Sequence, residues 1–444
     1  MRAAANGSRS GANKERLLEL GASLFATQGY AQVSVRDLAA RLGVTTGAIY
    51  SNFNSKGELL AAVLDVRITA DMERSERTRS GSWLPQVVHG SFLRASERGQ
   101  MRALLLEAAA ASRTDPELRD SLRPTLTALI DRWINDYRAW QQTGDVDPDL
   151  DMADLLTVLW AVELGIGVLE AQGAMRIKAV ALADFIGGFL QSLEGEGAVR
   201  PGDTGLQHFG FATVSPPTRK SARSSSVARP AANLPPQREP HGEPTTPTRL
   251  IDVATELFAE KGYGAVTVRD LARATGLTTG SIYGNFANKA LLLVEAIESL
   301  ITRVEDLPAP LLESGSPMEQ VEFHLQNFSE RARLRALLIE GAAAARSDRE
   351  VHDRLQDMEL RHLDLWVAGS ERWLAVCASP PTVDMHTAVA TVWSAELGLA
   401  LLEALDLSTP SPSRIVAVFR RMFSAFGLAR TEVGPTGTVT AESP

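Results

Sequence analysis

Residues 36–56 read RDLAARLGVTTGAIYSNFNSK, and residues 269–289 repeat them as RDLARATGLTTGSIYGNFANK. The two copies lie 233 residues apart and align without a gap. In the first copy, Ser34 is a candidate N-cap with Asp37 three residues later, and apolar residues follow at helical spacing. Gly43 ends this helix, since glycine adopts the left-handed conformation without steric cost. Each copy therefore predicts a helix, a tight turn and a second short helix.

The second helix of each copy has an outer side made of small, polar and aromatic groups. In the first copy, Thr45 is placed to cap this helix. Ile49 and Phe53 lie four residues apart and face inward, which leaves the other residues to face out. Such a helix after a glycine turn is typical of the DNA-reading helix of a helix-turn-helix.

A longer motif surrounds each copy. GVTTGAIYSNF at residues 43–53 is followed by Lys56 and preceded by a helix that ends in LFATQGY at residues 24–30. The second copy has LFAEKGY, GLTTGSIYGNF and a lysine at the same offsets. These motifs resemble the TetR family of transcriptional repressors. The resemblance implies an all-α fold with two tandem TetR-like repeats, each an N-terminal three-helix domain with the helix-turn-helix followed by a helical ligand and dimerisation bundle.

The resemblance also implies which residues contact DNA. Tyr50 and Tyr283 are expected to offer their hydroxyls to phosphates, and Lys56 and Lys289 to hold phosphates from the first turn of the next helix. The other expected contacts are Ser34, Arg36, Thr45, Thr46, Gly47, Ala48, Ser51 and Asn52, with Thr267, Arg269, Thr278, Thr279, Gly280, Ser281, Gly284 and Asn285 in the second copy. Simple solvation of a helix surface is the alternative, but the occurrence of the pattern twice favours DNA contact.

The composition fits a helical protein that binds DNA locally rather than over its whole surface. The 444 residues are 44% hydrophobic with a formal net charge of −9, so DNA contact must come from a few placed groups and helix termini. Cys377 is the single cysteine, which excludes an intramolecular disulfide and fits a reducing compartment. The chain starts without the apolar core of a signal peptide. The apolar run 155–169 contains Glu163 and is too short to span a bilayer comfortably. We therefore expect a cytoplasmic protein with no membrane partner.

The duplication extends far beyond the helix-turn-helix. RALLLEAAAASRTD at residues 102–115 matches RALLIEGAAAARSD at 335–348, again with an offset of 233. Three tryptophans of the first half have partners at this offset in the second half. A whole domain of about 180 residues is therefore repeated. Glu107 and Glu340 precede the alanine-rich runs and are expected to face solvent or a neighbouring helix.

Composition changes along the chain predict the domain boundaries. Residues 196–245 are rich in Pro, Ser, Gly and Arg and cannot bury enough apolar surface to order themselves. The predicted segments are a disordered arm (1–12), a first DNA-binding domain (13–60), a first ligand and dimerisation domain (61–195), a disordered linker (196–245), a second DNA-binding domain (246–293), a second ligand and dimerisation domain (294–428) and a disordered tail (429–444).

The bundles carry candidate residues for an apolar ligand pocket, because aromatic and aliphatic side chains line most small-molecule sites. They are Phe92, Leu104, Trp133, Trp140, Trp160 and Glu163 in the first repeat and Trp366, Trp373, Trp393 and Glu396 in the second. Plain core packing is preferred for any single tryptophan. A carboxylate within an apolar helix needs a partner. Glu163 and Glu396 could orient a polar group of an effector or lie at the helix interface between the lobes.

No pattern supports catalysis, a metal or a cofactor: the sequence has no CxxC, HExxH, GxSxG or P-loop motif. The leading interpretation is a transcriptional regulator, a repressor released by a small and mostly apolar effector. Its two DNA-binding domains (13–60 and 246–293), called heads below, would let one chain bind a near-palindromic DNA operator as a pseudo-dimer. Dimerisation of whole chains stays open. The alternative is an interaction or scaffold protein that kept its helix-turn-helix domains without sensing a ligand.

Overall fold

The computed structural model describes residues 2–79, 95–142, 147, 149–175, 177–193, 246–304, 316–326, 328, 331–376 and 383–428. The predicted linker and tail lie outside these ranges. Every regular element in the described ranges is an α-helix, so the predicted all-α class is confirmed.

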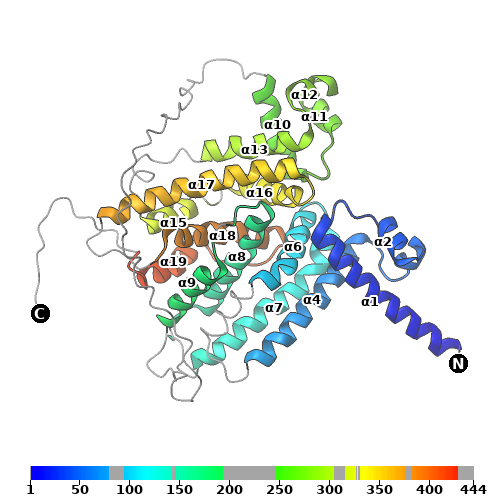
Figure 1. Cartoon of the computed structure of the whole chain (residues 1–444), viewed down its shortest axis with the longest axis horizontal. Helices are drawn as coiled ribbons and strands as arrows, with labels where there is room; N and C mark the ends of the chain where they lie inside the picture. The colour runs from blue at the N-terminus through cyan, green and yellow to red at the C-terminus, as the bar shows by residue number, and fades with distance from the viewer. Residues whose placement is uncertain are drawn as a thin grey trace, which may run out of the picture.

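The helices of the first repeat recur in the second, which also contains α15, at positions whose equivalents in the first repeat lie outside the described residues (Figure 1). The first repeat contains α1 (Arg2–Gln28), α2 (Val35–Leu42), α3 (Thr46–Tyr50), α4 (Lys56–Arg79), α6 (Ala95–Ser112), α7 (Pro116–Gln142), α8 (Met152–Ala171) and α9 (Ala179–Gln191). The second contains α10 (Thr246–Lys261), α11 (Val268–Thr275), α12 (Thr279–Asn285), α13 (Lys289–Val304), α15 (Pro317–Gln326), α16 (Ala332–Ala345), α17 (Arg349–Val376), α18 (Met385–Ala404) and α19 (Pro412–Ser424).

Two of the predicted boundaries fall inside helices, and the domain limits stay predictions. Helix α1 begins at Arg2 and includes residues 2–12 of the segment 1–12, where a disordered arm is expected. The alanines at positions 3–5 are strong helix formers, and no proline interrupts the segment. The boundary between residues 60 and 61 falls inside α4, whose buried face continues as far as Ile68. The head is therefore joined to its bundle by one continuous helix, and α13 does the same in the second repeat.

The two repeats pack against each other through α8 and α18, which lie at the centre of the molecule (Figure 1). A Cβ atom on Gly165 would lie 1.7 Å from the carbonyl oxygen of Ser394, and one on Gly398 would lie 1.7 Å from that of Ala161. These two contacts are related by the 233-residue offset, so the interface is reciprocal. Glycine is required at both positions because the backbones of the two helices touch.

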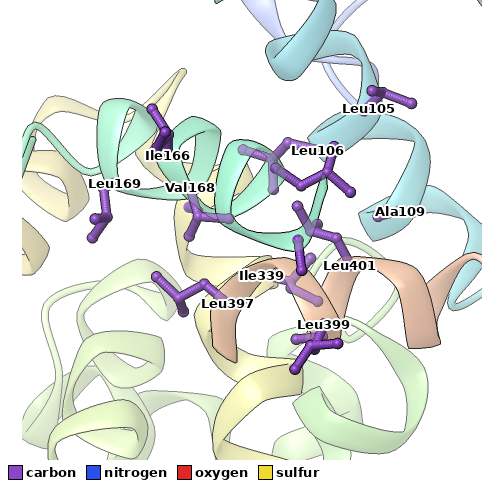
Figure 2. Close-up of a cluster of buried hydrophobic side chains, with 14 of the residues drawn as sticks. Leu105, Leu106, Ala109, Ile166, Val168, Leu169, Ile339, Leu397, Leu399 and Leu401 are labelled. Atoms are coloured by element: carbon purple, nitrogen blue, oxygen red, sulfur yellow. The ribbon is translucent and has the colours of Figure 1, made fainter. Parts of the chain in front are cut away.

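The core between the repeats is apolar and shared. Leu105, Leu106 and Ala109 come from α6, and Ile166, Val168 and Leu169 from α8 (Figure 2). Ile339 of α16 and Leu397, Leu399 and Leu401 of α18 complete the labelled cluster (Figure 2). Burial of apolar area of this kind is the main stabilising contribution in protein association.

Helices α8 and α18 are long and apolar enough to cross a membrane by length and composition. In the structure, 94% of the apolar window of α8 and 89% of that of α18 are buried inside the protein. Their composition is explained by the shared core, because a helix that is apolar all round needs protein neighbours on all sides.

Candidate nucleic-acid interface

The first helix of each helix-turn-helix is capped as the sequence predicts. The amide of Asp37 donates to Ser34 Oγ (3.1 Å), and the amide of Ser34 donates to the Asp37 carboxylate (3.1 Å). Thr267 and Asp270 form the same capping box in the second repeat. The Ser34 hydroxyl and, to a smaller extent, the Ser34 amide donate to the Asp37 carboxylate and lower its pKa, so the carboxylate stays charged at the positive end of the helix dipole. The predicted DNA contacts of Ser34 and Thr267 stay predictions, because both hydroxyls already bond to the aspartate.

The turn and the second helix also form as predicted. Gly43 ends α2 with a φ of +69°, a left-handed conformation that favours glycine. Thr45 caps α3 by accepting a hydrogen bond from the amide of Ala48 (3.2 Å), and Thr278 does the same for Ser281 in α12. The buried Ile49 fixes the inner face of α3. The outer face of the short helix is therefore held by its caps and by one apolar anchor.

The outer faces of α3 and α12 are open to solvent. Tyr50 is 51% exposed and Tyr283 is 54% exposed, which is unusual for side chains of this size. The other exposed candidates are Arg36, Thr46, Gly47, Ala48, Ser51 and Asn52, with Arg269, Thr279, Gly280, Gly284 and Asn285; Ser281 is half-buried. These predicted DNA-contact residues are thus accessible to solvent in both repeats, and their roles stay predictions.

The side chains of the two candidate asparagines already donate a hydrogen bond within their own helices. The side-chain amide of Asn52 donates to the carbonyl of Ala48 (3.0 Å), and that of Asn285 donates to the carbonyl of Ser281 (2.8 Å). These bonds hold both side chains against the end of their own helix. Only the remaining donor and acceptor sites of each amide are available for a base edge or a phosphate.

The two lysines donate hydrogen bonds to backbone carbonyls within their own heads, which were not predicted. Lys56 Nζ donates to the carbonyls of Tyr30 (2.8 Å) and Val33 (3.2 Å) and lies 4.0 Å from the centre of the Tyr30 ring. Lys289 repeats this arrangement on the equivalent turn. Burial lowers the pKa of both lysines, and a nearby glutamate opposes that shift. Two of three ammonium protons are therefore used inside the head, and one remains for a phosphate.

We expect Lys56→Met to destabilise the first head by about 1–3 kcal/mol, because two turn carbonyls lose their donor. Lys289→Met should do the same in the second head. Hydrogen exchange of the amides in α2 or α11 measures the effect locally. Lys261→Met, which changes an exposed lysine, serves as the matched control. Exchange rates equal to the wild type would show that the lysines act on phosphates alone.

Glu107 and Glu340, expected to face solvent or a neighbouring helix, are instead buried beneath the heads, with exposed fractions of 4% and 6%. Glu107 accepts a hydrogen bond from the amide of Tyr30 (2.7 Å), and Glu340 accepts one from Tyr263 (2.9 Å). Burial raises the pKa of both carboxyls, and arginines of the opposite repeat oppose the shift. Both glutamates lie at the same position after the duplicated RALL segments, which is the signal in the sequence that they have the same role.

In the first repeat, the structure brings together part of the predicted ligand set. Trp133 and Trp160 meet edge to face with ring centres 5.9 Å apart, and Leu104 is fully buried. Glu163 pairs with Arg98 at 2.7 Å, which is the partner that its carboxylate requires. Phe92 and the side chain of Trp140 lie outside the described part of the structure.

In the second repeat, side chains fill the space around the predicted tryptophans. Trp366, Trp373 and Trp393 are all buried. The ring of His324 packs at a tilt against Trp366, and that of His362 packs at a tilt against Trp393. The cavity that these rings border has a volume of about 10 Å³, which is room for one water molecule. A polar cluster therefore fills the space between Trp366 and Trp393, and the ligand-binding role of these residues stays a prediction.

Glu396 is the centre of that cluster. Its carboxylate lies 3.0 Å from Arg331 Nε and 3.0 Å from His324 Nδ1. Burial raises the pKa of Glu396, but Arg331 and His324 together lower it to about 2. Burial and Arg331 lower the pKa of His324 to about 4, so this imidazole is neutral at pH 7. Arg331 occupies the position that Arg98 has in the first repeat, so each buried glutamate has an equivalent arginine partner.

Comparison with known proteins connects this geometry to a family. The sequence model of the bacterial regulatory proteins of the tetR family matches residues 17–63 and again residues 250–296. Two segments of the chain belong to the tetR family. The two matches cover α1 to α4 and α10 to α13, which carry the helix-turn-helix and the start of the connecting helix. Relatives that match the chain are named as HTH-type transcriptional repressors and regulators.

Individual relatives resemble different parts of the chain. The HTH-type transcriptional repressor KstR2 of Rhodococcus jostii is 35% identical over 89 residues, which are 19% of this chain and 44% of the relative. This chain therefore spans less than half the length of that relative. The HTH-type transcriptional regulator UidR of Escherichia coli K12 is 25% identical over 187 residues, which are 40% of this chain and 92% of the relative. A match to nearly all of one relative within 40% of this chain agrees with the duplication.

Proposed function

We propose that one chain acts as a pseudo-dimeric repressor that places its two heads on a near-palindromic operator. The observation that carries this proposal is the reciprocal packing of α8 on α18. A two-fold dimer interface uses the same surface on both partners, so that each contact occurs twice. The Gly165–Ser394 and Gly398–Ala161 contacts have this property within a single chain.

The placement of the heads supports the same proposal. The helix-turn-helix elements of both repeats lie at the same end of the molecule, α11 and α12 at one corner and α2 at the next (Figure 1). Dimeric helix-turn-helix proteins bind two half-sites about one helical turn apart, of the order of 34–36 Å. The recognition segments TTGAIYSNF and TTGSIYGNF differ only at positions 48/281 and 51/284. Two similar but unequal half-sites are therefore expected.

We further propose that the first repeat senses a small, mostly apolar effector. Its bundle has the buried Leu126 and Leu129 where the second repeat has Glu359 and His362. Apolar surroundings of Trp133 and Trp160 favour an apolar ligand, whereas the second repeat fills the equivalent region. The continuous helix α4 connects this bundle with the first head, so an effector that prefers one tilt of α4 would change DNA affinity by its differential binding. The relatives that are named repressors support repression as the outcome.

Selection of bound fragments from a random DNA library tests the operator proposal. We expect two similar half-sites in opposite orientation. On the selected operator, Tyr50→Phe and Tyr283→Phe should each weaken binding about 10- to 100-fold, because each removes one hydrogen bond to a charged phosphate. The loss should be equal on variant sequences, since phosphate contacts carry little sequence information.

Val180→Ala, at another exposed apolar side chain far from the heads in sequence, is the control and should bind as the wild type. A single unrepeated element in the selected DNA would contradict the paired heads. Wild-type affinity of both tyrosine variants would contradict the assigned surface.

A further inference from the structure

In each repeat, a buried carboxylate of the helical bundle reaches the turn between the first and second helices of the head. Glu107 of α6 accepts the amide of Tyr30, and Lys56 holds the carbonyl of the same residue. Gly29, directly before this tyrosine, has a φ of +85°, and a Cβ atom there would lie 3.3 Å from Glu107 Oε1. The turn is therefore shaped around the carboxylate, and the position of Glu107 determines where the turn can lie.

The opposite repeat holds each of these carboxylates. Arg346 Nε lies 2.9 Å from Glu107, and Arg113 Nε lies 3.1 Å from Glu340. The two arginines are equivalent by the 233-residue offset, and so are the two glutamates. The arrangement thus occurs twice with nearly equal lengths, once in each direction across the pseudo-two-fold axis.

The second head is contacted directly as well. Arg113 also donates through Nη2 to the carbonyl of Ala259, at the end of α10. A Cβ atom on Gly262 would lie 2.8 Å from the Cγ2 atom of Thr114, which belongs to the first repeat. The first repeat thus touches the turn of the second head with a charged group and with a methyl group.

A cleft of about 910 Å³ separates the two head turns at this place. Residues 27–32 line it from the first head and residues 262–265 from the second, with Glu107, Glu340 and Arg346 beside them. Open space lies between the turns, and the two arginine bridges are polar contacts that connect each head with the opposite repeat. A buried ion pair contributes little net stability, and setting a register is the best-attested use of such a pair.

We propose that Arg113 and Arg346 are positioning residues that set the separation of the two DNA-reading heads and thereby the spacing of the operator half-sites. Each arginine holds a glutamate of the opposite repeat, and that glutamate holds the turn of the head in the same opposite repeat. The inference rests on the proposed function for its DNA consequence, whereas its structural part concerns the free protein.

The distance between the heads tests the structural part without DNA. Spin labels at Ala40→Cys and Arg273→Cys, two equivalent exposed positions, report this distance in a Cys377→Ser background. Pulsed electron resonance should give one narrow distribution for the labelled parent. In the Arg113→Gln/Arg346→Gln variant the distribution should become at least twice as broad. An unchanged distribution would overturn the proposal.

Arg123→Gln is the matched control, because it removes another ion pair between the repeats, Arg123–Asp406 at 2.5 Å, which is exposed and does not involve the head turns. The control should keep the narrow distribution. Broadening of the same size in the control would also overturn the proposal, since any loss of an interface charge would then suffice.

The DNA consequence is measured on operators whose half-sites are moved apart base pair by base pair. The wild type and Arg123→Gln should prefer one spacing over its neighbours at least tenfold, and the double variant should lower this preference to about twofold. A double variant that keeps the tenfold preference contradicts the role in spacing. If the wild type binds no paired half-sites at all, the proposed function fails, and the spin-label distances still decide on the bridges.

Discussion

Gly165→Ala is expected to disrupt the packing of the two repeats. The added methyl group would lie 1.7 Å from the carbonyl oxygen of Ser394, a backbone atom that no side-chain rotation can move away. Overpacking of a well-packed core costs about 1–3 kcal/mol, and a clash with backbone should exceed this range. Gly398→Ala should have an equal effect, because its methyl group would meet the carbonyl of Ala161 at the same distance.

Chemical denaturation of the whole chain measures this effect. Gly99→Ala is the matched control, since Gly99 is also helical and its nearest atom, on the Arg102 side chain, would be 3.8 Å from the new methyl group. The control should keep or slightly raise stability, because alanine is the better helix former. Wild-type stability of both Gly165→Ala and Gly398→Ala would contradict the close crossing of α8 and α18.

Glu396→Ala is expected to cost about 3–5 kcal/mol, because it leaves a buried arginine without its carboxylate. The side chains of Arg331 and Glu396 are only 0% and 4% exposed. Glu163→Ala should cost less, since Arg98 and Glu163 are 17% and 11% exposed and water can replace the lost partner. Equal losses of the free energy of unfolding in the two variants would contradict the difference between the repeats.

The same cluster predicts a dependence on pH. The pKa of Glu396 is lowered to about 2, whereas an unperturbed glutamate titrates near 4.3. The ionised carboxylate therefore contributes stability above the unfolded value, and this contribution is lost as the pH falls from about 4.3 towards about 2. Glu396→Gln should lack this part of the acid destabilisation in a series of unfolding titrations between pH 5 and pH 2.

The sequence was most informative where local chemistry decides the structure. The capping box at Ser34 and the turn at Gly43 form as predicted, because capping depends on residues at most three or four positions apart, and Thr267 forms the same box in the second repeat. The duplication could also be read directly, since a constant offset between two similar segments is visible in the sequence itself. The DNA-contact roles of Tyr50 and its neighbours are still predictions, although the structure leaves these side chains accessible.

The sequence was least informative where residues of different repeats meet. Glu107 and Arg346 lie more than two hundred positions apart, so no helical spacing could show that each buried carboxylate has an arginine from the opposite repeat. The predicted role of Lys56 covered only the phosphate contact, because its two carbonyl acceptors belong to a turn before α2 and could not be assigned from the motif. The polar filling around Trp366 and Trp393 could not be read from the sequence, because His324 and His362 have no motif in common and approach the same tryptophan rings only in the folded bundle.

Helix α4 is longer than its packing requires. Ile68 is the last buried apolar residue among its described side chains, whereas the helix continues to Arg79. Charged residues with good helix propensity extend a helix beyond the part that packing requires. The consequence for function is that head and bundle share a rigid element, which an effector could tilt.

The number of chains on one operator tests the central proposal most directly. Sedimentation of the purified protein with its selected operator gives the mass of the complex, and the chain contributes 47.8 kDa per copy. The pseudo-dimer predicts one chain per operator, with a footprint on both half-sites. Two chains on one operator, each protecting a single half-site, would contradict it.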